Sequence, residues 1–171
     1  MKFWTIQSLE AWDQAVTSGY LVGNPKYIDK DWLVSYRWMM NEMKKRLIYY
    51  KGEFPIWLWT KRPDLRIGGR LGKGQQGVLI EAELNKDEVL ISDFMAWHIV
   101  LNNDYLTLSE EEDNKLANGT FLKTKEQSWI RIFEYHEIKQ YDYWKGEDLL
   151  QAVTGRIELS RLKKIKEFTS R

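Results

Sequence analysis

The sequence predicts an α+β fold: a single domain, residues 1–171, in which a mixed or antiparallel sheet packs against helices. Residues 3–7 and 151–159 alternate with the two-residue period of a β-strand. Residues 29–49 carry apolar side chains three and four positions apart, which is the period of an α-helix. Residues 54–60 (FPIWLWT) are apolar on both sides, which is typical of a strand covered on both faces.

The amino-acid composition indicates a folded globular domain. Hydrophobic residues make up 43% of the chain and charged residues 30%, which is the balance of a folded globular domain. The formal net charge of +1 provides no overall attraction to nucleic acid or to acidic membranes. Because the chain has no cysteine and no apolar run of signal-peptide or membrane-span length, we expect a cytoplasmic protein. Its nine tryptophans predict half-buried surfaces or an aromatic-lined cleft.

Local signals divide the first half of the chain into elements. After the strand over residues 3–7, Ser8 can cap a short helix and Gly19 can end it. The helix over residues 29–49 follows, and residues 54–60 are a candidate central strand. Residues 61–77 contain five Gly among five Lys and Arg side chains, which predicts an exposed basic loop.

The middle of the chain contains two further strands and a helix. Between residues 78 and 84, apolar side chains at the even positions alternate with Glu81 and Glu83, which predicts a strand with one polar face. The next strand is expected over residues 88–91, after a turn, and Ser92 or Asp93 can then cap a helix.

The remaining signals vary in strength. Residues 109–118 are acidic and predict a surface helix or loop, whereas residues 128–135 are too short to assign. Residues 151–159 predict a strand whose odd-numbered side chains face inward. After a turn, residues 163–168 predict an edge strand whose lysines oppose aggregation.

The chain lacks the standard catalytic and phosphate-binding motifs. His98 and His136 are the only histidines, and their spacing is not that of metal ligands, so we expect no metal site. His98 is a candidate catalytic acid–base residue, because histidine titrates near neutral pH. The competing interpretation is a half-buried histidine with a structural hydrogen bond.

Aromatic and basic side chains adjoin one another after the central strand. Trp57 and Trp59 share one side of that strand, and Arg66 follows in the basic loop. Such a set can stack an aromatic ring and bind a phosphate, which predicts a ligand-binding cleft. The alternative is a strand core followed by a solvated loop.

Gln151 is a second candidate catalytic residue. The alternation places its amide on the face that otherwise carries Val153 and Ile157, and a buried amide needs hydrogen-bond partners. A polar residue at the water-exposed start of a strand explains the same pattern equally well.

Several segments together resemble an uncharacterised bacterial family, found mainly in Gram-positive genomes and described as a domain of unknown function. The resemblance covers nearly the whole chain and implies no established activity. The segments are WTIQ at 4–7, YRWM at 36–39, PIWLW at 55–59, PDLR at 63–66, SDFMAWHIVLN at 92–102, SWIRIF at 128–133 and QAVTGRIEL at 151–159.

The order of elements is also similar to small ADP-ribosyltransferase-like folds, which bind NAD between split sheets. That resemblance implies NAD as a cofactor and a site formed by the opening and closing strands. The opening motif of those enzymes usually has His or Arg, where this chain has Thr5 or Gln7. The closing motif usually has Glu, where this chain has Gln151. Both departures argue against transferase activity.

The leading functional hypothesis is a protein with a cleft that binds a nucleotide-like ligand, with a divergent ADP-ribosyl-transferring or NAD-cleaving enzyme as its most specific form. Its ligand-binding candidates are Thr5, Gln7, Arg37, Trp57, Trp59 and Arg66. The alternative is a non-enzymatic module that uses an aromatic face to bind a protein partner or a second copy of itself. The near-neutral charge argues against nucleic acid as a partner.

Overall fold

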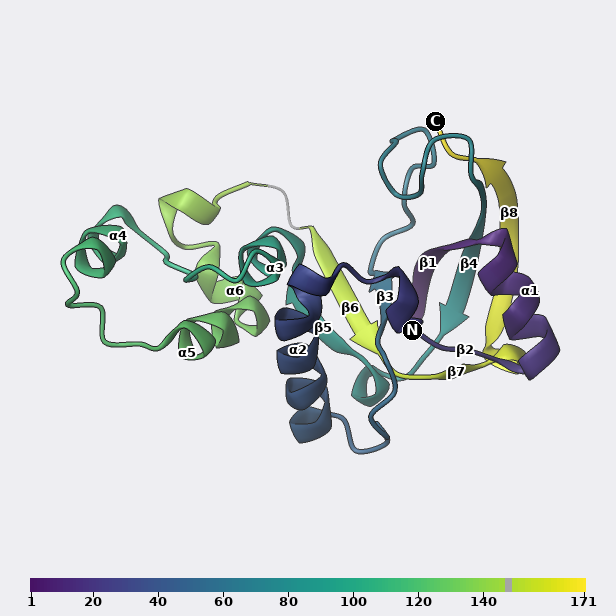
Figure 1. Cartoon of the computed structure of the whole chain (residues 1–171), viewed down its shortest axis with the longest axis horizontal. Coiled ribbons are helices and arrows are strands. Elements are labelled where there is room, and N and C mark those ends of the chain that lie inside the picture. The colour runs from purple at the N-terminus through teal and green to yellow at the C-terminus, as the bar shows by residue number, and fades with distance from the viewer. Residues whose placement is uncertain (147–148) are drawn as a thin grey trace. The chain divides into compact units, whose positions relative to one another are not determined.

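A computed structural model describes residues 1–146 and 149–171 and confirms the α+β class (Figure 1). The main sheet has six strands in the order β5-β6-β3-β1-β4-β8, and a second sheet pairs β2 with β7. The strands are β1 (Lys2–Ser8), β2 (Tyr20–Leu21), β3 (Ile56–Trp59), β4 (Gln76–Glu83), β5 (Leu90–Asp93), β6 (Leu150–Thr154), β7 (Ile157–Glu158) and β8 (Leu162–Thr169). The α-helices are α1 (Leu9–Ser18), α2 (Leu33–Arg46), α3 (Phe94–Leu101), α4 (Glu110–Ala117), α5 (Lys125–Trp129) and α6 (Tyr135–Ile138).

Contacts within the chain define two compact units. The first unit consists of Met1–Tyr27, Glu42–Leu90 and Gln151–Arg171, and the second of Ile28–Asn41 and Ile91–Leu150. No helix among the described residues is long and apolar enough to cross a membrane.

Strand β1 fixes the register of the sheet in the first unit. Trp4 lies opposite Trp59 of β3 on one side and opposite Glu81 of β4 on the other, and both pairings are antiparallel. Trp59 in turn lies opposite Gln151 of β6. Because residues paired across strands project to the same side, Trp4, Trp59 and Gln151 share one face of the sheet.

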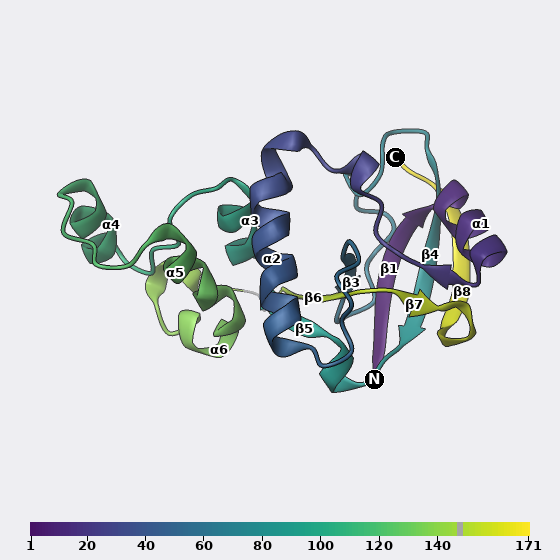
Figure 2. The same ribbon diagram turned by 60° about the horizontal axis from the view of Figure 1, so that its bottom comes forward.

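The opposite face of this sheet is the apolar core of the first unit. Its fully buried side chains are Phe3, Ile56, Leu58, Val78, Ile80, Ala82 and Ala152. Helix α1 packs against β1 and β4 and buries Trp12 and Ala15 (Figure 2). The strand–helix prediction for the start of the chain is confirmed, since the Ser8 hydroxyl accepts a hydrogen bond from the Ala11 amide and Gly19 ends α1 with a φ of 85°.

Three sequence predictions place an element boundary wrongly. The helix expected over residues 29–49 starts later, because the Asp29 carboxylate accepts a hydrogen bond from the Asp31 amide and favours a 3₁₀ turn over Lys30–Trp32 before α2. The strand expected over residues 88–91 starts later, as β5 (Leu90–Asp93). Glu88 instead accepts a hydrogen bond from the Asn85 amide and closes another 3₁₀ turn. The strand expected over residues 151–159 is divided into β6 and β7.

Burial of the central strands also differs from the predicted alternation. The odd-numbered residues of β6 were expected to face the core, yet Ala152 and Thr154 are buried as well as Gln151 and Val153. In β4, Leu79 on the expected polar face is fully buried, and only the end with Glu81 and Glu83 is polar. Both strands lie within the sheet and are covered on both faces, which overrides the half-buried pattern.

The predicted edge strand is confirmed as β8, the last strand of the sheet. Its pairing with β4 carries an irregularity between Leu79 and Ile80, where Lys166 and Lys164 are the respective partners. Ile165 is therefore an extra residue on the edge strand. A bulge and exposed lysines both discourage pairing with a further strand.

Glu88 and Arg161 join two connections of the first unit. The Arg161 guanidinium donates to both carboxylate oxygens of Glu88, with a distance of 2.7 Å from Nη2 to Oε2, and its Nε donates to the Glu83 carbonyl. The Glu88 carbonyl accepts a hydrogen bond from the Thr154 hydroxyl at 2.7 Å. The turn before β5 is thus attached to both β6 and the 3₁₀ turn that precedes β8.

In the second unit, an extended segment over residues 104–108 is held by side chains. Side chains of other residues form hydrogen bonds with its backbone: Trp129 with Asp104, Ser128 and Arg131 with Leu106, Trp144 with Thr107, and Glu112 with Leu108. Arg131 also forms two 2.7 Å hydrogen bonds with the Glu112 carboxylate. The buried Arg131 side chain therefore ties α4 to this segment.

Asp93 caps α3 as predicted, and its second oxygen lies 3.2 Å from Nζ of Lys139.

Stability below pH 5 tests the Glu88–Arg161 pair. Hydrogen bonds from Arg161 lower the pKa of Glu88 from 4.5 to about 2. The pair therefore stabilises the fold fully above pH 4.5, and that contribution is lost as the pH falls toward 2. We expect Glu88→Gln to lower the unfolding free energy by about 1 kcal/mol at pH 7, and by progressively less from pH 4.5 to pH 2. Urea titrations at several pH values measure this difference, and a difference independent of pH would contradict the assignment. Glu111→Gln, which removes a surface ion pair with Lys115, is the control.

The Arg131–Glu112 pair predicts strongly coupled substitutions. Arg131→Met leaves the Glu112 carboxylate and the Leu106 carbonyl without their donor, so we expect a loss of about 3 kcal/mol in unfolding free energy. Adding Glu112→Gln removes the uncompensated charge while keeping an acceptor for the Leu108 amide, and should recover part of that loss. Urea denaturation of both single variants and of the double variant gives the coupling energy. Additive losses would show that the pair does not act as a unit.

Candidate functional site

Three tryptophans gather on one face of the sheet in the first unit. Trp4 and Trp59 are directly opposite each other, and Trp57 lies two residues along β3 on the same side. All three are only partly buried, whereas Val153 and Leu79 on this side are fully buried. We call Trp4, Trp57 and Trp59, together with Gln151, the tryptophan face.

A side chain of the loop over residues 61–75 covers part of this face. The Arg70 guanidinium carbon lies 4.7 Å from the centroid of the Trp59 ring. Its Nε and Nη1 atoms are buried and have no hydrogen-bond partner among the described residues. Burial lowers the pKa of Arg70, while the charge of Asp64 opposes that shift. A guanidinium nevertheless stays charged at neutral pH, so a positive charge lies against the Trp59 ring.

The second half of the loop is anchored to the end of the chain. The Ser170 carbonyl accepts a hydrogen bond from the Gly74 amide, the Ser170 amide donates to the Gln75 carbonyl, and the Ser170 hydroxyl donates to the Leu71 carbonyl. A side chain at Gly77 would meet Leu71 at 2.5 Å and Phe168 at 2.8 Å, so these two side chains fill the space above that glycine. Figures 1 and 2 show the loop beside the carboxyl end of β8.

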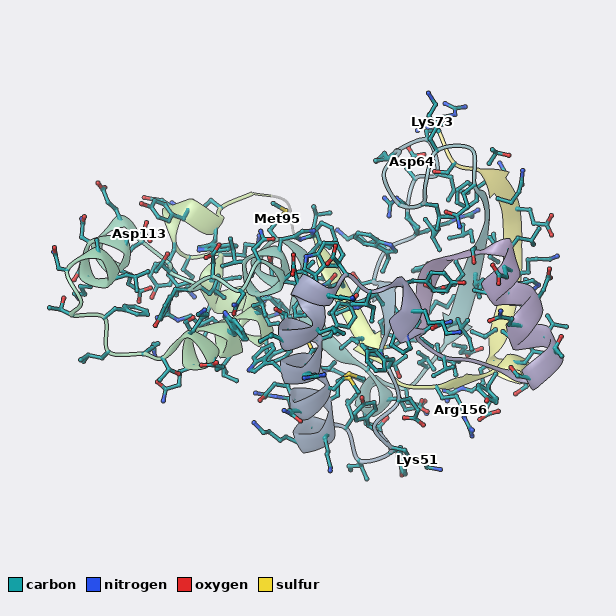
Figure 3. All side chains as sticks on the ribbon, viewed as in Figure 1. Lys51, Asp64, Lys73, Met95, Asp113 and Arg156 are labelled. Carbon is teal, nitrogen blue, oxygen red and sulfur yellow. The ribbon has the colours of Figure 1, made fainter. Side chains whose placement is uncertain are left out.

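The first half of the loop is more exposed and contains an internal ion pair. Asp64 accepts hydrogen bonds from Nη2 of Arg66 at 2.7 Å and from its Nε at 3.0 Å. These bonds lower the pKa of Asp64 to about 2. Figure 3 shows Asp64 and Lys73 on this loop near the end of β8. Residues 61–75 contain five Lys and Arg residues and one Asp, a net charge of +4 in a chain whose net charge is +1.

The structure places Gln151 beside Trp59. The two residues are directly opposite in the pairing of β6 with β3, and the Gln151 side chain is 5% exposed. Gln151 therefore lies on the tryptophan face, at the level of Trp4 and Trp59. This is the part of the predicted ligand site that the sheet brings together.

Thr5 and Gln7 lie on the other side of the sheet. Each is adjacent to a residue of the tryptophan-bearing side of β1, so each projects to the core face. Thr5 is 1% exposed, and its hydroxyl accepts a 2.8 Å hydrogen bond from the Gln7 amide. The sheet thus separates these two candidates from Trp57, Trp59 and Gln151.

The remaining candidates belong to other elements of the chain. Arg66 is exposed and paired with Asp64 in the loop. Arg37 and His98 belong to the second unit, where Arg37 is exposed on α2. His98 is also exposed, its Nδ1 lies 2.8 Å from the Phe94 carbonyl oxygen, and its ring contacts the Phe94 ring edge to face. The hydrogen bond agrees with the structural interpretation of His98, whereas its exposure differs from the half-buried position expected there.

The sequence did not predict Trp4 on the tryptophan face or Arg70 over it. The placement of Trp4 could have been predicted in part: adjacent residues of a strand project to opposite faces, so Trp4 and Thr5 cannot share a face. Arg70 carried no such signal, since its position over Trp59 depends on the path of an irregular loop. Among residues 1–146 and 149–171, no group of three or more His, Asp or Glu side chains could hold a metal ion.

Comparison with known proteins places the chain in a family. The model of a family described as Domain of unknown function (DUF3841) matches residues 2–125. No significant match was found among curated proteins or among solved structures. The match covers β1, β3 and β4 and the loop over residues 61–75, which carry most of the tryptophan face. The chain therefore belongs to the DUF3841 family.

Proposed function

We propose that the tryptophan face binds the planar ring of a nucleotide-like ligand. The observation that carries this proposal is the stacking of the Arg70 guanidinium on Trp59 at 4.7 Å. A guanidinium is planar and approaches an aromatic ring much as a heteroaromatic base does. Part of the Trp59 ring is therefore covered by the side chain of a loop residue.

Neighbouring groups supply further parts of a ring-binding site. Trp4 and Trp57 lie beside Trp59 on the same face and can contact the edges or the sugar of a ligand. Gln151 lies opposite Trp59 and is the polar side chain of this face, and an amide carries both a donor and an acceptor. Apolar walls with a few placed polar groups are the usual composition of small-molecule sites.

NAD and ADP-ribose are candidate ligands of this class through the resemblance of layout to ADP-ribosyltransferase-like folds. The geometry supports binding better than transfer, because Thr5 and Gln7 are separated by the sheet from Gln151. Hydrogen-bonded Thr5 is also fully buried. The proposal is therefore a binding function, with NAD among the ligands to be tested.

The protein-interaction alternative has less support from the tryptophans. It requires exposed aromatic side chains, yet of the nine tryptophans only Trp32 is more than about a third exposed, at 39%. The exposed apolar side chains with the largest accessible fractions, Leu122 and Ile48, belong to different units, and Ile48 is followed by the exposed Tyr49. Scattered exposure of this kind is normal for a globular surface.

Substitution of Trp59 tests the proposed function. Base–aromatic stacking contributes about 1–3 kcal/mol, so Trp59→Leu should weaken ligand binding roughly 10-fold or more, whereas Trp59→Phe keeps a ring and should retain most of it. Calorimetric titration and thermal shift with adenosine, ADP, ADP-ribose and NAD measure the effect. Trp32→Leu, at the exposed tryptophan of the second unit, is the matched control. If none of these ligands stabilises the unmodified protein, the proposal is wrong.

A further inference from the structure

Arg70 differs from the other cations of its loop. Arg70 is half-buried, whereas the other four are exposed. Arg66 is paired with Asp64, and Arg70 forms no ion pair among the described residues. Two of its nitrogen atoms are buried without a hydrogen-bond acceptor. Unsatisfied buried donors are rare in native proteins and require a specific explanation.

Asp64 does not supply the missing acceptor. Its carboxylate accepts hydrogen bonds from Nε and Nη2 of Arg66 and from the Arg66 backbone amide. Asp64 influences Arg70 only through its charge. The loop thus holds a guanidinium beside an aromatic ring without providing its anion.

From these contacts we infer that Arg70 is the receptor for the phosphate group of the ligand, and that it leaves the Trp59 ring when the ligand binds. The ligand class is a nucleoside phosphate, with its ring on Trp59 and its phosphate on Arg70. The placement of the ligand ring on Trp59 rests on the proposed function. The phosphate part has independent support in the net charge of +4 over residues 61–75.

The anchoring of the loop permits such an exchange. The hydrogen bonds that fix the second half of the loop involve the backbone at Leu71, Gly74 and Gln75, and none involves the Arg70 side chain. Arg70 therefore lies where the anchored half meets the exposed half. Rotation of its side chain away from Trp59 breaks the stacking contact but none of the anchoring hydrogen bonds.

Inorganic pyrophosphate and adenosine separate the two halves of the ligand. We expect pyrophosphate to stabilise the unmodified protein, and Arg70→Gln to weaken pyrophosphate binding at least 5-fold. Adenosine carries no phosphate, so it should bind Arg70→Gln at least as tightly as the unmodified protein, because the guanidinium no longer covers Trp59. ADP should lose affinity in Arg70→Gln. Calorimetry and thermal shift at constant ionic strength measure all three ligands.

Arg66→Gln is the matched control, because it removes the same charge from the same loop at a side chain that is already paired. Equal weakening of pyrophosphate binding by Arg66→Gln and Arg70→Gln would overturn the assignment, since the loop charge alone would then account for binding. Absence of pyrophosphate binding to the unmodified protein would also overturn it. Absence of adenosine binding with Arg70-dependent pyrophosphate binding would refute the ring site and leave the phosphate site standing. If Arg70→Gln does not fold, Arg70→Lys keeps the charge and should still weaken pyrophosphate binding by loss of the guanidinium.

Discussion

The position of Trp4 between Trp59 and Glu81 is the constraint on which the sheet of the first unit depends. Side chains alternate along a strand, so a register shift of one residue would exchange the two faces of β1. Phe3 would then lie on the tryptophan face and Trp4 in the core. Phe3 and Thr5 are fully buried in the observed register, which opposes such a shift. The same interaction that forms the core therefore presents the tryptophans on the other face.

The contact between Arg70 and Trp59 is weakly held. A partly desolvated cation–π contact contributes about 0.5–2 kcal/mol. Leaving buried donors without partners costs about 1–3 kcal/mol, which is of the same size. These opposing effects nearly cancel, so the contact itself offers little resistance to an incoming ring. The anchoring hydrogen bonds of Ser170 are separate from this contact and keep the loop in place.

Sequence reasoning succeeded where the signal is local and failed where contacts are distant. Ser8 and Asp93 cap their helices as predicted, because a capping side chain bonds an amide three residues away. The shared side of Trp57 and Trp59 also follows from strand periodicity alone. Boundaries at Asp29 and Glu88 were missed because side-chain hydrogen bonds form 3₁₀ turns there. Arg70 could not be placed, since its neighbour in space is eleven residues away along an irregular loop.

Periodicity also bears on the kind of chemistry that the sheet supports. In the resemblance to ADP-ribosyltransferase-like folds, the opening and closing strands together form one site, which here would need Thr5 or Gln7 to act with Gln151. Trp4 pairs with Trp59, and Trp59 pairs with Gln151, so Gln151 projects to the same face of the sheet as Trp4. Thr5 and Gln7 project to the other face. Side chains on opposite faces of one sheet cannot contact the same sugar, because the backbone lies between them. A ligand on the tryptophan face would meet aromatic rings, one amide and a guanidinium, the groups on which the proposed binding of a nucleotide-like ligand rests.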